Sequence, residues 1–155
     1  MAKKVSDEQC RANYEGVVAL FRAAVPDSDR FEVVYGAGVG VGLTNAVIVL
    51  VTTYTYTSYA IGFDVNANEI MILPIAQDLS GAGQPISLKK SEIDKAKISM
   101  ISKELTIIAK FLPKKYVRFS VQWFINDDPD ETVVCVLQTE EAKRFHEFFK
   151  QAYSK

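Results

Sequence analysis

Apolar residues recur every three to four positions over residues 6–25, which is the spacing of one face of an α-helix. Ser6 stands at the N-cap position, Gln9 occupies the capping-box position, and Pro26 stops the helix. The polar face mixes acidic and basic side chains, whereas helices that lie on membranes are rich in lysine and arginine there. The pattern predicts a helix that packs on the protein core through Cys10, Tyr14, Val17, Val18, Phe21, Ala24 and Val25.

Between residues 31 and 138 the apolar period changes to two, β-branched and aromatic residues become frequent, and short polar turns separate the runs. This pattern indicates antiparallel strands. The clearest strand is 116–125, whose one face would hold Val117, Phe119, Val121, Trp123 and Ile125. The predicted strands are 31–39, 42–51, 54–65, 69–75, 95–102, 104–112, 116–125 and 132–138.

A second helix is predicted over 140–153, with Thr139 as its cap. Its apolar face holds Ala142, Phe145, Phe148, Phe149 and Ala152. One helix, a series of antiparallel strands and one helix predict an α+β fold in a single domain over 1–155. We expect an N-terminal helix, a strongly curved antiparallel sheet or small barrel of about seven or eight strands, and a C-terminal capping helix.

A basic hairpin is the first candidate site. Three residues separate strands 104–112 and 116–125, which is a common hairpin loop length. This register keeps one face apolar and sets Lys110 opposite Arg118, with Lys114 and Lys115 at the tip. Like charges opposed across strands repel, and an anion or an acidic partner offsets that repulsion. These four residues are therefore the candidate anion- or partner-binding site; the alternative is a solvated face that protects a sheet edge.

Composition narrows the classes of protein. The chain has 155 residues, 48% apolar and 24% charged, with a net charge of −1. These values are typical of a globular domain, and they provide no overall field for nucleic acid, which we exclude as a partner. The charge is uneven, because residues 1–86 hold five basic and nine acidic residues, whereas residues 87–155 hold thirteen basic and ten acidic ones. The basic residues of the second half form either a solvated face that protects sheet edges or an anionic contact surface.

Residue types that support catalysis or metal binding are sparse. His146 is the single histidine, and the sequence places no nucleophile or carboxylate beside it. The glycine-rich segment 36–42 lacks the third glycine of a dinucleotide fingerprint and precedes a strand instead of a helix. The acidic cluster 127–131 lacks the spacing of an EF-hand. We expect no enzymatic activity, no cofactor and no metal site.

The cellular compartment is predicted from the termini and the cysteines. The N-terminus has no apolar segment of the signal-peptide kind, and the longest wholly apolar run, 46–51, is far shorter than the about 20 residues that cross a bilayer. Cys10 and Cys135 each lie within an apolar pattern, which is typical of reduced, buried cysteines. These features predict a cytoplasmic protein.

A tyrosine-rich segment is the second candidate site. Tyr54, Tyr56 and Tyr59 alternate with threonine and serine, and they belong either to packing and a partner surface or to the mouth of a barrel that carries a small apolar ligand. No charged residue occurs over 46–63. Because both faces of such a segment are hard to cover in a small domain, a weak homodimer is also expected.

Three segments in this order are similar to bacterial pleckstrin-homology-like domains of the short PH or GRAM type. Residues 42–51, with Leu43-Thr44-Asn45 before an apolar run, resemble the family's early strand. Residues 85–93 resemble its mid-domain strand, and residues 133–145 resemble its last strand and C-terminal helix with an anchoring Phe145. The resemblance covers roughly residues 31–153.

The resemblance implies two near-orthogonal sheets capped by the C-terminal helix, in a domain that binds lipids or proteins and does not catalyse. Family members that bind lipid headgroups carry basic residues around the first two strands, whereas residues 31–86 hold neither lysine nor arginine. We therefore expect a non-enzymatic binding module with a protein partner. An anionic membrane surface is the second candidate partner, and a carrier of a small apolar ligand is the alternative function.

Overall fold

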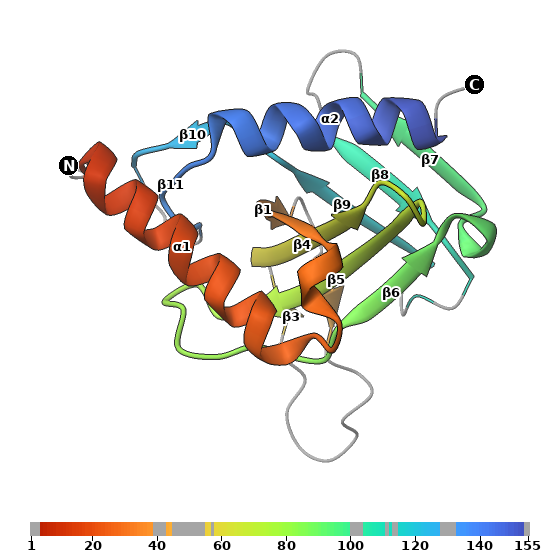
Figure 1. Ribbon diagram of the computed structural model, residues 1–155, viewed down its shortest axis with the longest axis horizontal. Helices are drawn as coiled ribbons and strands as arrows, with labels where there is room; N and C mark the ends of the chain where they lie inside the picture. Colours follow the sequence, from red (N-terminus) through yellow and green to blue (C-terminus); the bar gives the residue numbers. More distant parts are fainter. Residues whose placement is uncertain are drawn as a thin grey trace.

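A seven-stranded antiparallel sheet forms the centre of the fold (Figure 1). The structure, a computed structural model, describes residues 4–38, 43–44, 55–56, 58–99, 104–110, 112, 115–127 and 133–153. The sheet consists of β1 (Glu32–Gly38), β4 (Ser58–Asp64), β5 (Glu69–Ile75), β6 (Ile86–Lys89), β7 (Lys95–Ile98), β8 (Leu105–Ile108) and β9 (Tyr116–Ser120). Two short pairs join β2 (Leu43–Thr44) to β3 (Thr55–Tyr56) and β10 (Phe124–Ile125) to β11 (Val136–Leu137).

The strand order is β6-β5-β4-β1-β9-β8-β7, and each neighbouring pair is antiparallel. The chain passes through β1, β4, β5 and β6 as neighbours, then through β7, β8 and β9, and β9 returns to pair with β1. The edges are therefore β6 and β7, and the sheet is open between them. The predicted α+β class is confirmed as an open sheet with a helix at each end of the chain.

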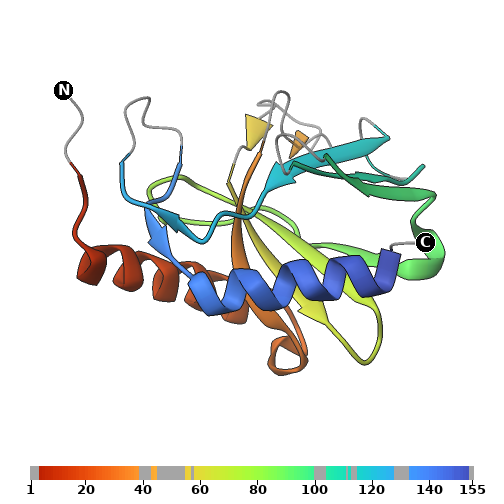
Figure 2. The same cartoon turned by 90° about the horizontal axis from the view of Figure 1, so that it is seen from above.

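The two helices, α1 (Asp7–Ala24) and α2 (Thr139–Tyr153), form a V in Figure 1 whose closed end lies near β10 and β11. As predicted, Ser6 caps α1, because its hydroxyl accepts a hydrogen bond of 3.1 Å from the backbone N–H of Gln9. Figure 2 shows the two helices from above, lengthwise across the lower part of the view. No helix in the described ranges has the length and apolar character to cross a membrane.

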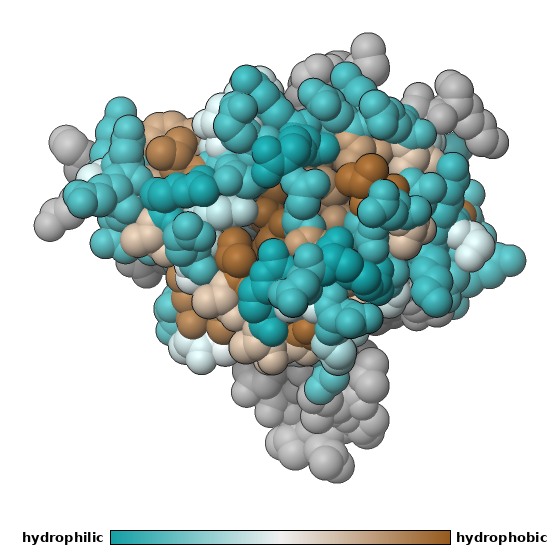
Figure 3. All heavy atoms as spheres, in the orientation of Figure 1, coloured by the Kyte–Doolittle hydropathy of each residue, from teal (hydrophilic) through white to brown (hydrophobic). Residues whose placement is uncertain are grey.

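The core lies on both faces of the central strands. All seven residues of β4 are buried. Alternate strand residues belong to two apolar clusters: Val33, Tyr35 and Ala60 pack with α1, whereas Val34 and Ile61 pack with α2. Between the two helices, Figure 3 shows apolar side chains framed by hydrophilic ones. The predicted apolar faces of α1 and α2 are thus the faces that cover the sheet. Cys10 and Cys135 are buried free thiols, as expected.

The predicted strand 116–125 is wrong beyond Ser120. There β9 ends opposite Ala37 of β1, and a separate strand, β10, begins at Phe124. Trp123, expected in the core, is 49% exposed. The reason is that the side chain of Gln138 occupies the edge of β1 beyond this point, where a continued β9 would otherwise pair.

The predicted register of the basic hairpin is also wrong. Arg118 lies opposite Thr106, not Lys110, so the pairing is displaced by four residues. The connection contains two turns, in which the N–H of Leu112 donates to Ala109 and the N–H of Lys115 donates to Leu112. They fold the buried Leu112 back onto the core. A displacement by an even number keeps the same residues facing inward, so apolar alternation did not distinguish the two registers.

Other strands are shorter than predicted. The described parts of the predicted strand 54–65 contain β3 and β4, and the described part of 132–138 contains the two residues of β11. The alternation of apolar residues does not predict strand β6, although residues 85–93 resemble the mid-domain strand of the family. Residue 42, residues 45–51 and residues 100–102, the remaining parts of the predicted strands 42–51 and 95–102, lie outside the described residues.

Candidate functional site

The outward face of β7, β8 and β9 is the strongest candidate for a binding surface. Burial alternates along all three strands, so that one face enters the core while the other does not. The described helices pack against the inner face or against other strands. We call this outward face the basic sheet face, which consists of Lys95, Lys97, Thr106, Ile108, Tyr116 and Arg118.

The register arranges the basic sheet face in two rows. One row runs from Lys97 across Thr106 to Arg118. The other runs from Lys95 across Ile108 to Tyr116. A polar, cationic row therefore lies beside a row with an aliphatic and an aromatic side chain, which is a composition suited to binding another protein.

Two contacts hold Arg118 across the basic sheet face. Its Nε donates to Oγ1 of Thr106 at 3.3 Å, and its guanidinium carbon lies 5.4 Å from the centre of the Tyr116 ring. A planar guanidinium with several donors suits carboxylates, which accept two parallel hydrogen bonds. Because Arg118 is already oriented, less side-chain entropy is lost when it binds an acidic group.

Of the predicted hairpin residues, Arg118 belongs to the basic sheet face. Lys110 and Lys115 are exposed in the connection between β8 and β9, and Nζ of Lys115 donates to the carbonyl of Lys110 at 3.1 Å. Lys114 lies outside the described residues. Lys95 and Lys97 were not chosen as site residues from the sequence. Their alternation with Ala96 and Ile98 was the available signal, but only the strand order places β7 beside β8 and β9.

Three arginines elsewhere in the described chain have carboxylate partners, whereas Arg22 donates to the backbone carbonyls of Ser28 and Phe31. Arg11 pairs with Glu141 at 2.9 Å, and Arg144 pairs with Glu32. Arg30 lies 2.7 Å from Asp64 and 2.9 Å from Glu69. On the basic sheet face, by contrast, the described residues form no ion pair with Lys95, Lys97 or Arg118. Two acidic residues flank the face, since Asp94 directly precedes β7 and Glu104 directly precedes β8.

The Arg30 cluster has perturbed acids but is internally neutralised. Burial raises the pKa of Asp64, but hydrogen bonds from Arg30 and from the N–H groups of Ala67 and Asn66 outweigh it and leave that pKa below its usual value. Burial likewise raises the pKa of Glu69, and hydrogen bonds from Arg30 and Ser87 outweigh it. Both acids remain ionised at neutral pH, bound to a cation of this chain, so the cluster is structural.

The tyrosines of the second candidate site are not brought together in the described structure. Tyr54 lies outside the described residues, and Tyr56 belongs to β3. Tyr59 is fully buried, and its ring packs edge-on against Phe119 with a centroid distance of 6.5 Å. The charge-free segment 46–63 behind the homodimer prediction is described mainly in β4, which this chain itself covers on both faces. The homodimer stays a prediction.

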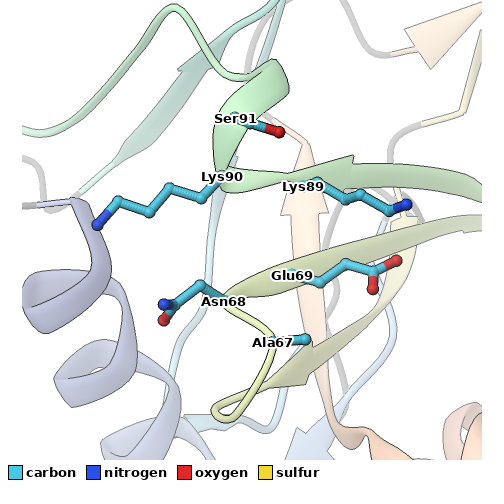
Figure 4. A pocket seen from close by; sticks show the side chains of 6 residues that line it. All are labelled: Ala67, Asn68, Glu69, Lys89, Lys90 and Ser91. Carbon is cyan, nitrogen blue, oxygen red and sulfur yellow. The ribbon is translucent and has the colours of Figure 1, made fainter.

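A polar hollow of about 520 Å³ lies at the ends of β5 and β6 (Figure 4). Figure 4 shows Lys90 extending toward α2, whereas Lys89 extends away from it, on the side of the Glu69 carboxylate. The two ammonium groups point apart and do not converge on one anion. The hollow is lined by Ala67, Asn68, Glu69, Lys89, Lys90 and Ser91.

His146 and the acidic turn do not form a catalytic or metal centre within the described residues. A ring nitrogen of His146, Nε2, lies 2.9 Å from the carbonyl oxygen of Val121, which ties α2 to the end of β9. Of the acidic cluster 127–131, only Asp127 is described. No group of three or more potential metal ligands occurs in the described ranges.

Comparison of the chain with family models, with curated proteins and with solved structures finds no match.

Proposed function

We propose that this chain is a non-enzymatic, PH-like binding module whose basic sheet face binds an acidic surface of a protein partner. The observation that carries the proposal is the gathering of three cations, Lys95, Lys97 and Arg118, on one sheet face that no described helix covers. None of the three forms an ion pair among the described residues, whereas Arg11, Arg30 and Arg144 do. Complementary charge is what selects and orients a partner at such a face.

The C-terminal helix supports the PH-like part of the proposal, because it packs on the core of the sheet as the resemblance implies. The seven strands form one open sheet, and not the two near-orthogonal sheets that the resemblance implies. The resemblance also implies binding without catalysis. A scaffold with two helices and an extended apolar core holds the three strands of the basic sheet face in a fixed geometry, as binding with little loss of entropy requires.

A protein partner is favoured over a membrane by the second row of the face. Ile108 and Tyr116 are half-buried and lie directly beside Thr106 and Arg118. A partly apolar centre with charges at its side is typical of a protein interface. A phosphoinositide site needs several cations around one headgroup, which the family places around its first strands. Here the first two strands of the seven-stranded sheet, β1 and β4, contain no lysine or arginine.

The test uses poly-L-glutamate as a probe for an acidic protein surface. We expect the wild-type protein to bind it in low salt and to lose at least tenfold in affinity between about 50 and 300 mM NaCl, because exposed charges are screened. The double variant Lys97→Glu with Arg118→Glu should bind at least tenfold more weakly in low salt. Isothermal titration calorimetry measures both effects.

The matched control is Lys4→Glu with Lys150→Glu, which makes the same change in net charge at exposed positions away from the face. Its affinity should stay within twofold of wild type. Equal weakening by both double variants would contradict a defined surface and indicate a net-charge effect. Tighter binding to vesicles with about 30% phosphatidylserine, or to duplex DNA, than to poly-glutamate would overturn the protein-partner assignment.

A further inference from the structure

The edge strand of the basic sheet face, β7, indicates how a partner binds as well as which charge it carries. Among the described residues, strand β7 is the last strand of the sheet, and β8 pairs with it. The N–H of Ser99 donates to the carbonyl of Glu104 at 2.8 Å. Because hydrogen-bonded pairs alternate along an antiparallel ladder, the odd-numbered residues of β7 are the ones whose backbone groups bond to β8. The N–H and C=O groups of Ala96 and Ile98 therefore point away from β8, along the open edge.

The side chains of β7 alternate in character as well as in direction. Lys95 and Lys97 are exposed and belong to the basic sheet face. Ala96 and Ile98 are half-buried and pack against the core cluster that includes α2. A strand added to β7 would face lysines on one side of the sheet and apolar side chains on the other.

We propose that the partner binds by adding an extended segment to the edge of β7, and that this segment alternates acidic and apolar residues. The acidic residues lie beside Lys95 and Lys97, while the apolar residues cover Ala96 and Ile98. Backbone groups of Ala96 and Ile98 provide the main-chain hydrogen bonds, and the alternation provides specificity. This inference rests on the proposed function and assigns the partner's sequence pattern.

Two synthetic peptides of identical composition test the pattern. One alternates glutamate and valine over six residues, and the other places three glutamates before three valines. Both carry the same charge, so the basic sheet face attracts them equally. We expect the alternating peptide to bind the wild-type protein at least tenfold more tightly, because only its side chains match both faces of β7.

The variant Ala96→Pro tests the main-chain contact. Proline removes the one N–H at Ala96, which points away from β8, so the β7–β8 ladder is retained. We expect the affinity of the alternating peptide to fall by about 3- to 10-fold, as for one lost hydrogen bond. Ala96→Val is the matched control, since it retains the N–H, and its affinity should stay within twofold. The melting temperature of each variant checks that it folds.

Amide hydrogen exchange on the wild-type protein tests the same contact without a substitution and decides the matter if Ala96→Pro does not fold. The alternating peptide should slow exchange at Ala96 and Ile98 at least tenfold. Equal binding of both peptides, with unchanged exchange at these amides, would overturn edge pairing. If Lys97→Glu with Arg118→Glu still abolished that binding, the proposed function would survive. If neither peptide bound the wild-type protein, both the edge pairing and the proposed function would be overturned.

Discussion

Replacement of Gln138 by leucine is expected to lower the free energy of unfolding by about 3–5 kcal/mol. Gln138 is fully buried. Its side-chain amide forms hydrogen bonds with both backbone groups of Tyr35: the N–H of Tyr35 donates to Oε1 at 2.7 Å, and Nε2 donates to the carbonyl of Tyr35 at 3.0 Å. Leucine removes both hydrogen bonds to these buried backbone groups, and each such loss costs about 1–3 kcal/mol.

A third bond adds to the effect. Nε2 of Gln138 also donates to the carbonyl of Gln122 at 2.7 Å, which holds the chain where it departs from the sheet after β9. Urea unfolding followed by circular dichroism measures the change. Gln9→Leu is the control, because Gln9 is exposed, and it should change stability by less than about 0.5 kcal/mol. A Gln138→Leu variant within about 1 kcal/mol of wild type would contradict the role of the amide.

Replacement of Arg30 by methionine is expected to cost about 2–4 kcal/mol at pH 7. It leaves the carboxylates of Asp64 and Glu69 next to each other without their cation, and their side chains are only 8% and 6% exposed. Breaking a fully buried pair costs about 3–5 kcal/mol. The expected value is lower because Arg30 is itself 38% exposed and water partly screens it.

The pH dependence of the free energy of unfolding should change sign when Arg30 is replaced by methionine. In the wild type the pKa values of Asp64 and Glu69 are lowered, so their stabilisation is present above the unfolded values of about 4 and is lost as pH falls through the folded values. Without Arg30, burial raises both pKa values, so the variant should gain stability as the pH falls from 7 toward 5.

Urea unfolding at pH 7 and pH 5 tests this sign. Arg144→Met is the control, because it removes the exposed pair with Glu32 and should cost less than about 1 kcal/mol with the pH dependence of wild type. If Arg30→Met and wild type responded to pH in parallel, the buried acids would not depend on Arg30.

The sequence predicted those parts of the fold that rest on local periodicity. The helix over 6–25 and the helix over 140–153 occur with their expected apolar faces, and most strands occur near their predicted positions. The hairpin register was missed, because a displacement by four residues preserves alternation and the buried Leu112 lies in the connection. The end of β9 was missed because it depends on Gln138, a residue 18 positions later that pairs with the backbone of β1.

The candidate site could be predicted only in part, for the same reason. Arg118, Lys110 and Lys115 were identified by their charge along one predicted hairpin. Their relation to Lys95 and Lys97 depends on β7 lying next to β8 and on which side of β7 enters the core. These are properties of the sheet as a whole, and charge counted along the sequence does not contain them.

The most direct test of the basic sheet face is an amide chemical-shift titration of the ¹⁵N-labelled full chain with poly-L-glutamate. We expect the largest shifts at Lys97, Thr106 and Arg118, with smaller shifts on the adjacent strand positions and none on α1. The shifts should disappear at about 300 mM NaCl, where exposed charges are screened. Shifts centred on α1 or on the exposed Trp123, or no shifts at millimolar probe in low salt, would contradict the assignment of this face as the binding surface.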